Sequence, residues 1–243
     1  MVKDIAKILI NQRENKVSAS LYYWLQIIFS FNSNRIEGST LSEKQTQQVF
    51  DTGTIFADEN GLIVVDDVLE TSNHFRMFDY VLDTIDVDLT SEYLFKLHTM
   101  LKRGTKSELD SKMNVGGFKQ FPNQIGSIEA VQTTLPAEVP HAIQSLLEKW
   151  NADPHSNLLD FAKFHYRFET IHPFSDGNGR IGRLILFKEL CKADLMPLVI
   201  RESNKPFYLR GLKKFEDDDS YLVDTLGAEQ DYYTQLVERF LEI

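Results

Sequence analysis

Residues 172–183 bring together side chains suited to phosphate chemistry. Their sequence is His-Pro-Phe-Ser-Asp-Gly-Asn-Gly-Arg-Ile-Gly-Arg. Apolar residues at helical spacing precede and follow this run, so its glycines lie where a loop enters a helix. A helix N-terminus exposes unpaired backbone N–H groups and the positive end of the helix dipole, and glycine lets a phosphate oxygen approach them. With one imidazole, one carboxylate and two guanidiniums nearby, the run predicts a site that transfers a phosphorus group.

Three other motifs do not fit this run. An EF-hand calcium loop is excluded because Arg180 stands at a ligand position and Phe187 replaces the bidentate glutamate. A Walker phosphate loop would need a Gly-Lys-Ser/Thr sequence, which is absent. A dinucleotide-binding fingerprint would follow a strand, whereas the residues before His172 have a helical pattern.

The run resembles the signature of the Fic-domain family, H-P-F-x-(D/E)-G-N-G-R-x-x-R, and matches it at every specified position. The resemblance implies an all-α helical bundle with a small β-hairpin, the flap, beside the active site. It also implies an enzyme that transfers AMP from ATP to a Ser, Thr or Tyr hydroxyl of a protein, itself included. The phosphate-transferring branch lacks the glycine–arginine part of the signature, which is complete here, so AMP transfer is favoured.

The resemblance assigns a role to each part of the run. His172 is expected to be the general base that accepts the hydroxyl proton, because imidazole titrates near neutrality. Asp176 is expected to hold Mg²⁺ (or Mn²⁺) against the phosphates of ATP. The expected nucleotide-binding residues are Gly177, Asn178 (backbone and side chain), Gly179, Arg180, Arg183 and, by likeness to a family tyrosine near the base, Tyr208.

A second motif lies at the end of a helix predicted from about Val17 to Glu37. Ser33 to Gly38 reads Ser-Asn-Arg-Ile-Glu-Gly, which places Ser33 and Glu37 on one helix face before a helix-ending glycine. This run resembles the inhibitory motif (S/T)-x-x-x-E-(G/N) of self-restrained Fic proteins. We therefore expect Glu37 to pair with Arg183 and to prevent productive binding of ATP.

The remaining sequence predicts a single domain over 1–243, with an N-terminal region at 1–55 and a Fic core at 90–243. Helical spacing recurs through most of the chain and ends in stretches at 205–215, 220–226 and 229–241. Residues 115–134 differ, because glycines, a proline and scattered β-formers predict the hairpin flap. An open strand edge there would bind an unidentified target protein through main-chain hydrogen bonds.

The composition of the chain argues against a nucleic-acid-binding protein, a disulfide-stabilised protein and a membrane-spanning protein. The chain has 243 residues, and its formal net charge of −10 argues against binding of nucleic acid. A single cysteine, Cys191, precludes an internal disulfide and favours a cytoplasmic location. No apolar run reaches the ~20 residues of a membrane span, and the N-terminus lacks a signal-peptide pattern. A homo-oligomer is compatible with the sequence.

Alternatives to AMP transfer remain open at this stage. One is another Fic reaction. This could be transfer of a different nucleotide or phosphate group, or removal of AMP from a modified protein by a water that Glu37 activates. The other is a largely inactive ATP-binding regulatory protein that Glu37 holds off permanently.

Overall fold

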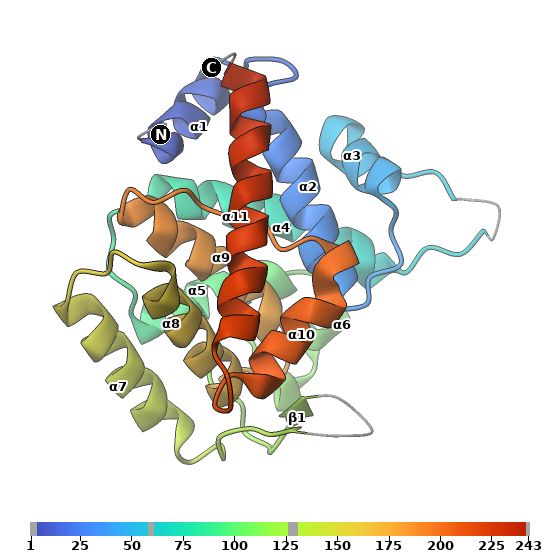
Figure 1. Cartoon of the computed structure of the whole chain (residues 1–243). Coiled ribbons are helices and arrows are strands. Elements are labelled where there is room, and N and C mark those ends of the chain that lie inside the picture. Colours follow the sequence, from blue (N-terminus) through green and yellow to red (C-terminus); the bar gives the residue numbers. More distant parts are fainter. Residues whose placement is uncertain (1–3, 58–60, 126–130, 242–243) are drawn as a thin grey trace.

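The computed structural model describes residues 4–57, 61–125 and 131–241, and their regular structure is almost entirely helical (Figure 1). The longer helices are α1 (Ile5–Glu14), α2 (Leu21–Ile36), α3 (Glu43–Thr52), α4 (Val65–Asp83), α5 (Ser91–Lys102), α7 (Val139–Ala152), α8 (Leu158–Ile171), α9 (Asn178–Lys192), α10 (Lys205–Lys214) and α11 (Ser220–Leu241). The short turns are α6 (Lys106–Leu109) and the 3₁₀ segments Ser111–Met113 and Glu202–Asn204. The all-helical class predicted from the sequence is therefore confirmed.

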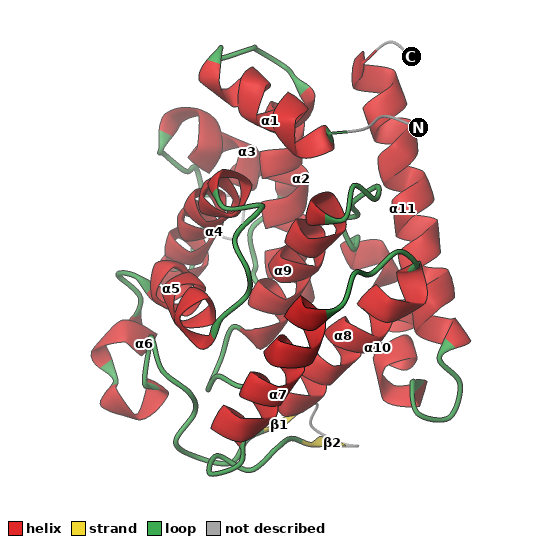
Figure 2. Ribbon diagram, turned by 90° about the vertical axis from the view of Figure 1, so that its left-hand side faces the viewer, coloured by secondary structure: helices red, strands yellow, loops and turns green. Residues whose placement is uncertain are grey.

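Helix α9 is the centre of the bundle. Its residues from Asn178 to Leu190 are all buried, which is expected of a helix surrounded by others rather than lying on a surface. Figure 2 shows α4 and α5 on one side of α9 and α8, α10 and α11 on the other. The 172–183 run thus begins in a loop and ends inside the best-buried helix of the described chain.

An aromatic cluster fixes α2 against α4 and α9. The rings of Phe29, Phe78 and Phe187 lie with centroids 5.3–5.8 Å apart, and all three side chains are buried. Aromatic pairs at such separations contribute about 0.5–1.5 kcal/mol each beyond their buried area. The middle of α2 is therefore held against the C-terminal half of α9.

Capping interactions explain both ends of α2. At its start, Ser20 Oγ accepts a hydrogen bond from Tyr23 N. At its end, Gly38 has φ +100°, and Ser39 N donates to Asn34 O at 3.0 Å, which closes the last turn. Glu37 is the last residue before this turn, as the sequence predicted.

The predicted flap at 115–134 is described only in part. Strand β1 (Gln124–Ile125) pairs antiparallel with β2 (Val131–Gln132), and the connecting residues 126–130 lie outside the described residues. The other described residues of this segment form turns and loop.

Two further observations concern the whole bundle. Residues 220–241 form one continuous helix, α11, instead of the two stretches predicted on either side of Gly227. Of the helices at positions 4–57, 61–125 and 131–241, none has both the length and the apolar character of a membrane span.

Candidate active site

His172 lies at the exact junction between α8 and the loop, in a left-handed backbone conformation (φ 52°, ψ 63°). Its backbone N–H donates to the carbonyl oxygen of Phe168, which closes the last turn of α8. Its Nδ1 lies 3.2 Å from the carbonyl oxygen of Glu169. If Nδ1 donates to that carbonyl, a neutral ring leaves Nε2 as the proton acceptor. Burial, with a smaller contribution from the charge of Lys119, lowers the pKa of His172 to about 4. The imidazole is thus neutral at physiological pH.

Asn178 fixes the shape of the loop. Its Oδ1 accepts from Phe174 N at 2.8 Å, and its Nδ2 donates to Phe174 O at 2.9 Å. The Phe174 ring is fully buried against His98, with ring centroids 4.2 Å apart. Both polar atoms of the Asn178 side chain therefore form hydrogen bonds within the loop, and the predicted contact of this side chain with a phosphate stays a prediction. Helix geometry leaves the first N–H groups of α9 to bind a ligand.

The carboxylate of Glu37 lies directly against this helix start. A Cβ built on Gly179 would fall 2.2 Å from Glu37 Oε1 and 2.8 Å from Arg183 Nη1. A glycine is required at position 179 for the carboxylate to approach this closely. Glu37 thus occupies space at the point where the sequence predicts a phosphate.

Arg183 joins α9 to both residues of the upstream motif. Its Nη2 lies 2.8 Å from Glu37 Oε1 and donates to Ser33 O at 2.9 Å, and its Nε donates to Ser33 Oγ at 3.1 Å. Burial alone would raise the pKa of Glu37, but the charges of Arg183 and Arg180 outweigh it and lower that pKa. The pairing of Glu37 with Arg183 expected from the sequence is present.

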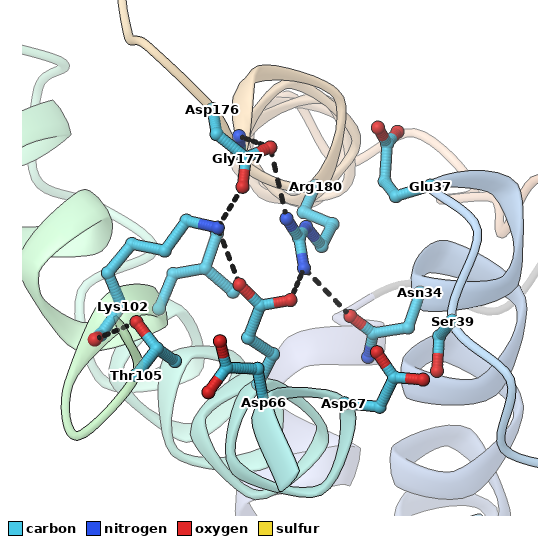
Figure 3. A network of polar contacts seen from close by, with 12 residues as sticks. Asn34, Glu37, Ser39, Asp66, Asp67, Lys102, Thr105, Asp176, Gly177 and Arg180 are labelled. Carbon is cyan, nitrogen blue, oxygen red and sulfur yellow. Dashed lines mark hydrogen bonds and ion pairs between the residues drawn. The ribbon is translucent and has the colours of Figure 1, made fainter. Parts of the chain in front are cut away.

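A second ionic network surrounds Asp176 and Arg180. Lys102 Nζ contacts the carboxylates of both Asp176 and Glu70, and Arg180 contacts Glu70 and, at 3.4 Å, Asp176. Figure 3 shows Lys102, Asp176 and Arg180 joined in this way, with Asn34 Oδ1 accepting from Arg180 at 3.4 Å. Burial opposes the effect, but the charges of Arg180 and Lys102 lower the pKa of Asp176 to about 2. Asp176 is therefore an ionised oxygen ligand with two cations beside it.

Asp176 could bind Mg²⁺ only if the phosphates of a substrate and water supplied the other ligands. Among residues 4–57, 61–125 and 131–241 there is no group of three or more His, Cys, Asp or Glu side chains arranged to hold a metal. Mg²⁺ commonly binds one or two carboxylates together with substrate phosphates and water, which a single ionised Asp176 could satisfy. A divalent ion there has to compete with Lys102 and Arg180 for the carboxylate.

A cavity of about 330 Å³ connects the two motifs. Its lining comes from the end of α2, from α8, from the start of α9 and from α10, and includes Glu37, His172, Gly179, Arg183 and Tyr208. Its volume is at the lower end of the range for small-molecule sites. The side chain of Tyr208 is 1% exposed, and its hydroxyl lies 2.7 Å from His165 Nε2. Tyr208 is thus anchored in the core at the cavity wall.

Comparison with known proteins identifies the segment that carries this loop. Residues 88–190 match the family model described as the Fic/DOC family. This segment is a Fic/DOC domain. The match includes the loop and the first thirteen residues of α9, Asn178 to Leu190, but it begins after the Ser33–Glu37 segment.

Two curated proteins are similar in sequence to parts of this chain. A protein adenylyltransferase Fic of Nematostella vectensis is 25% identical over 206 residues, which covers 78% of this chain and 43% of that protein. A probable protein adenylyltransferase of Aquifex aeolicus is 34% identical over 113 residues, or 43% of this chain and 34% of that protein. The chain therefore spans less than half the length of these curated relatives.

A solved structure shares the fold along almost the whole chain. The Fic domain containing signaling protein from Bacteroides thetaiotaomicron superposes with a TM-score of 0.75 at 23% identity. The superposition covers 98% of this chain and 94% of that one. The helices before residue 88 thus belong to the same architecture as the Fic domain.

Glu169 is a buried carboxyl group of the Fic domain that the sequence analysis did not single out. It lies on α8 at the cavity wall, is 7% exposed, and its Oε1 has no hydrogen-bond partner. A Cβ on Gly182 would fall 2.3 Å from this oxygen, so the carboxyl is pressed against α9. Burial raises the pKa of Glu169 from 4.5 to about 8, with the charge of Arg183 opposing. Glu169 is therefore largely protonated at neutral pH.

This protonation predicts a pH-dependent stability. Between pH 4.5 and 8 the folded chain retains a proton on Glu169 that the unfolded chain loses, so stability is full below pH 4.5 and falls as pH rises to 8. Each such pH unit changes the free energy of unfolding by about 1.4 kcal/mol. Glu169→Gln should therefore unfold at a higher temperature than the parent at pH 9, and the difference should shrink at pH 5. Glu238→Gln changes an exposed site and is the control. An equal difference in unfolding temperature at both pH values, or the same pH dependence in Glu238→Gln, contradicts the raised pKa of Glu169.

Proposed function

We propose that this chain is a protein adenylyltransferase, which moves AMP from ATP to a Ser, Thr or Tyr hydroxyl of a protein and also modifies itself. The observation that carries the proposal is the cavity shared by His172, the start of α9 at Gly179, and Arg183. It unites a neutral base, backbone phosphate donors and a guanidinium. The complete Fic signature and the names of the relatives support the same reaction.

In the proposed reaction a target hydroxyl oxygen attacks the α-phosphorus of ATP. His172 takes the hydroxyl proton at Nε2 while its Nδ1 remains directed at the Glu169 carbonyl, which holds the ring in place. The bond from the α-phosphorus to the bridging oxygen breaks, and pyrophosphate leaves. Residues 177–179 and Arg180 would bind phosphate oxygens, and Arg183 would bind the γ-phosphate. The chain thus acts mainly by positioning and by stabilising charge.

Asp176 would hold the divalent ion, preferably Mg²⁺, which supplies positive charge to the phosphate oxygens. Asp176→Asn keeps the shape of the side chain but removes its charge. We expect AMP transfer to fall by ~10²-fold, which is the scale of a few kcal/mol of lost charge stabilisation. Binding of Mn²⁺ in the presence of ATP, followed by electron paramagnetic resonance, should weaken in parallel.

The control for this prediction is Asp153→Asn, which changes an exposed aspartate at the end of α7. It should leave both transfer and Mn²⁺ binding at the parental level. Transfer that persists unchanged in EDTA would remove Asp176 and the metal from the mechanism.

Glu37 would restrain the enzyme. Its carboxylate pairs with Arg183 and lies against Gly179, so ATP could not place its phosphates there without displacing it. We propose that ATP either binds weakly or binds with its α-phosphorus out of line for attack. We propose that the target peptide lies along the β1–β2 segment and pairs with a strand edge through backbone hydrogen bonds.

Radiolabelled ATP distinguishes the proposed reaction from its alternatives. The parent chain and Glu37→Gly are incubated with ATP labelled at either the α- or the γ-phosphorus, and label in protein is measured. Label from the α-position alone supports AMP transfer, whereas label from the γ-position alone would show a kinase. No label from either position in Glu37→Gly supports a nucleotide-binding regulator. Release of AMP from protein labelled beforehand would show the reverse reaction.

A further inference from the structure

Lys119 is a buried lysine just before β1, and its ammonium contacts neutral groups. It is 2% exposed, and its Nζ donates to Asn123 Oδ1 at 2.7 Å, Thr133 Oγ1 at 2.6 Å and the carbonyl of Ile171 at 3.3 Å. Burial lowers the pKa of Lys119 to about 8. Burying an ammonium against neutral oxygens costs free energy unless all of its hydrogen bonds are satisfied. The three contacts must therefore offset that cost.

These contacts join the hairpin stem, which is residues 119–123 and Thr133 beside the β1–β2 pair, to the catalytic loop that begins at His172. Asn123 and Thr133 flank the β1–β2 pair, while Ile171 immediately precedes His172. Two further bonds follow the same path, because Lys119 N donates to Pro173 O at 2.8 Å and Asn123 Nδ2 donates to Phe174 O at 3.0 Å. The stem thus holds the carbonyl groups of three residues around His172, namely residues 171, 173 and 174.

The backbone of His172 requires such support. Its φ of 52° is in the left-handed region, which costs a non-glycine residue roughly 1–2 kcal/mol. Of the bonds from the stem, one holds the carbonyl before His172 and two hold the carbonyls after it. The conformation that directs the imidazole to the cavity is therefore braced on both sides.

We propose that Lys119 is a positioning residue, which couples the hairpin stem to the backbone around His172 so that the base and the peptide-binding edge keep one relative position. This inference rests on the proposed function. A displacement of only ~1 Å between base and hydroxyl can cost about 10²-fold in rate. Lys119 would act through His172 and the stem, without touching ATP.

The charge of Lys119 provides a signature that is independent of turnover. The charged groups acting on the His172 ring include Lys119 from the stem, Glu37 from the end of α2 and Asp176 from the loop; Lys119 lowers its pKa, and the two carboxylates raise it. Burial is the largest cause of the lowered pKa, and the Glu169 carbonyl opposes it. Removing the ammonium should raise the pKa of His172, whereas an ammonium too far from the ring to act on it would leave this pKa unchanged.

The test compares Lys119→Met, which keeps the length of the side chain, with Lys119→Arg, which keeps its charge. The pKa of His172 is measured by nuclear magnetic resonance, with its signals assigned from their loss in His172→Ala. We expect a higher pKa in Lys119→Met and a near-parental pKa in Lys119→Arg. In the Glu37→Gly background, Lys119→Met should lower kcat for AMP transfer by ~10²-fold with little change in ATP affinity, and Lys119→Arg should restore most of it.

The control is Lys112→Met at an exposed lysine of the adjacent 3₁₀ turn. It should change neither the pKa of His172 nor kcat for AMP transfer. If Lys119→Met does not fold, Thr133→Val removes one acceptor with little change of shape. It should speed backbone hydrogen exchange in peptides that cover residues 119–123 and 171–174. A parental pKa of His172 in folded Lys119→Met, or parental exchange in Thr133→Val, overturns the inference. Absence of AMP transfer in every variant, with the pKa raised as expected, would instead reject the proposed function.

Discussion

Replacing Glu37 by glycine should raise AMP transfer by ~10²-fold, most visibly as self-modification. The variant loses the carboxylate that pairs with Arg183 at 2.8 Å and lies against Gly179. Arg183 is then available to the γ-phosphate, and the start of α9 is open to the phosphate chain. The expected magnitude is that of correcting a misplacement of ~1 Å at the reacting phosphorus. The measurement is the initial rate of self-labelling with α-labelled ATP.

Arg183→Ala provides the internal test of this coupling. It should be poorly active whether or not Glu37 is present, because the γ-phosphate loses its guanidinium in both cases. Glu14→Gly, a matched change at the exposed end of α1, should label at the parental rate. If Glu37→Gly labels no faster than the parent, the inhibitory role is wrong. If the double variant Glu37→Gly with Arg183→Ala labels itself as fast as Glu37→Gly alone, inhibition does not act through Arg183.

Replacing His172 by alanine should abolish most AMP transfer while ATP still binds. Removal of a general base typically lowers the rate by 10²–10⁴-fold. Binding should persist because the start of α9 and Arg183 are unchanged by the substitution. The comparison is best made in the Glu37→Gly background, where the starting rate is highest. ATP affinity is measured separately by calorimetry.

The control for the base is His141→Ala, which removes an exposed imidazole from α7. It should retain the rate of its parent. Retention of that rate by His172→Ala would show that another group accepts the proton. Loss of both binding and transfer would show that His172 supports the loop rather than the chemistry.

Local sequence patterns were sufficient to predict the helical class and the position of the candidate loop. Helical spacing of apolar residues marked most helices, and the glycines marked the loop and the end of α2. The same spacing suggested a break near Gly227, but α11 continues through it. The glycine there packs near Leu158 of α8, and tertiary contact outweighs its low helix propensity.

The ionic network around Asp176 could not be predicted from local patterns. Lys102, Glu70 and Asn34 lie 74 or more residues from the partners they contact in the 172–183 run. Each of them is an ordinary helix residue, and only the packing of α2, α4 and α5 around α9 brings them together. Glu169 had a detectable signal, since it follows His165 at i+4 on the buried face of α8.

The most direct test of AMP transfer under the restraint of Glu37 is the intact mass of the purified protein. Glu37→Gly and the parent are incubated with ATP and Mg²⁺ and then weighed by mass spectrometry. AMP transfer under this restraint predicts that Glu37→Gly gains the mass of AMP less water, that the parent gains little, and that Glu37→Gly with His172→Ala gains none. A gain equal to a phosphate, or equal gains in the parent and in Glu37→Gly, would contradict it.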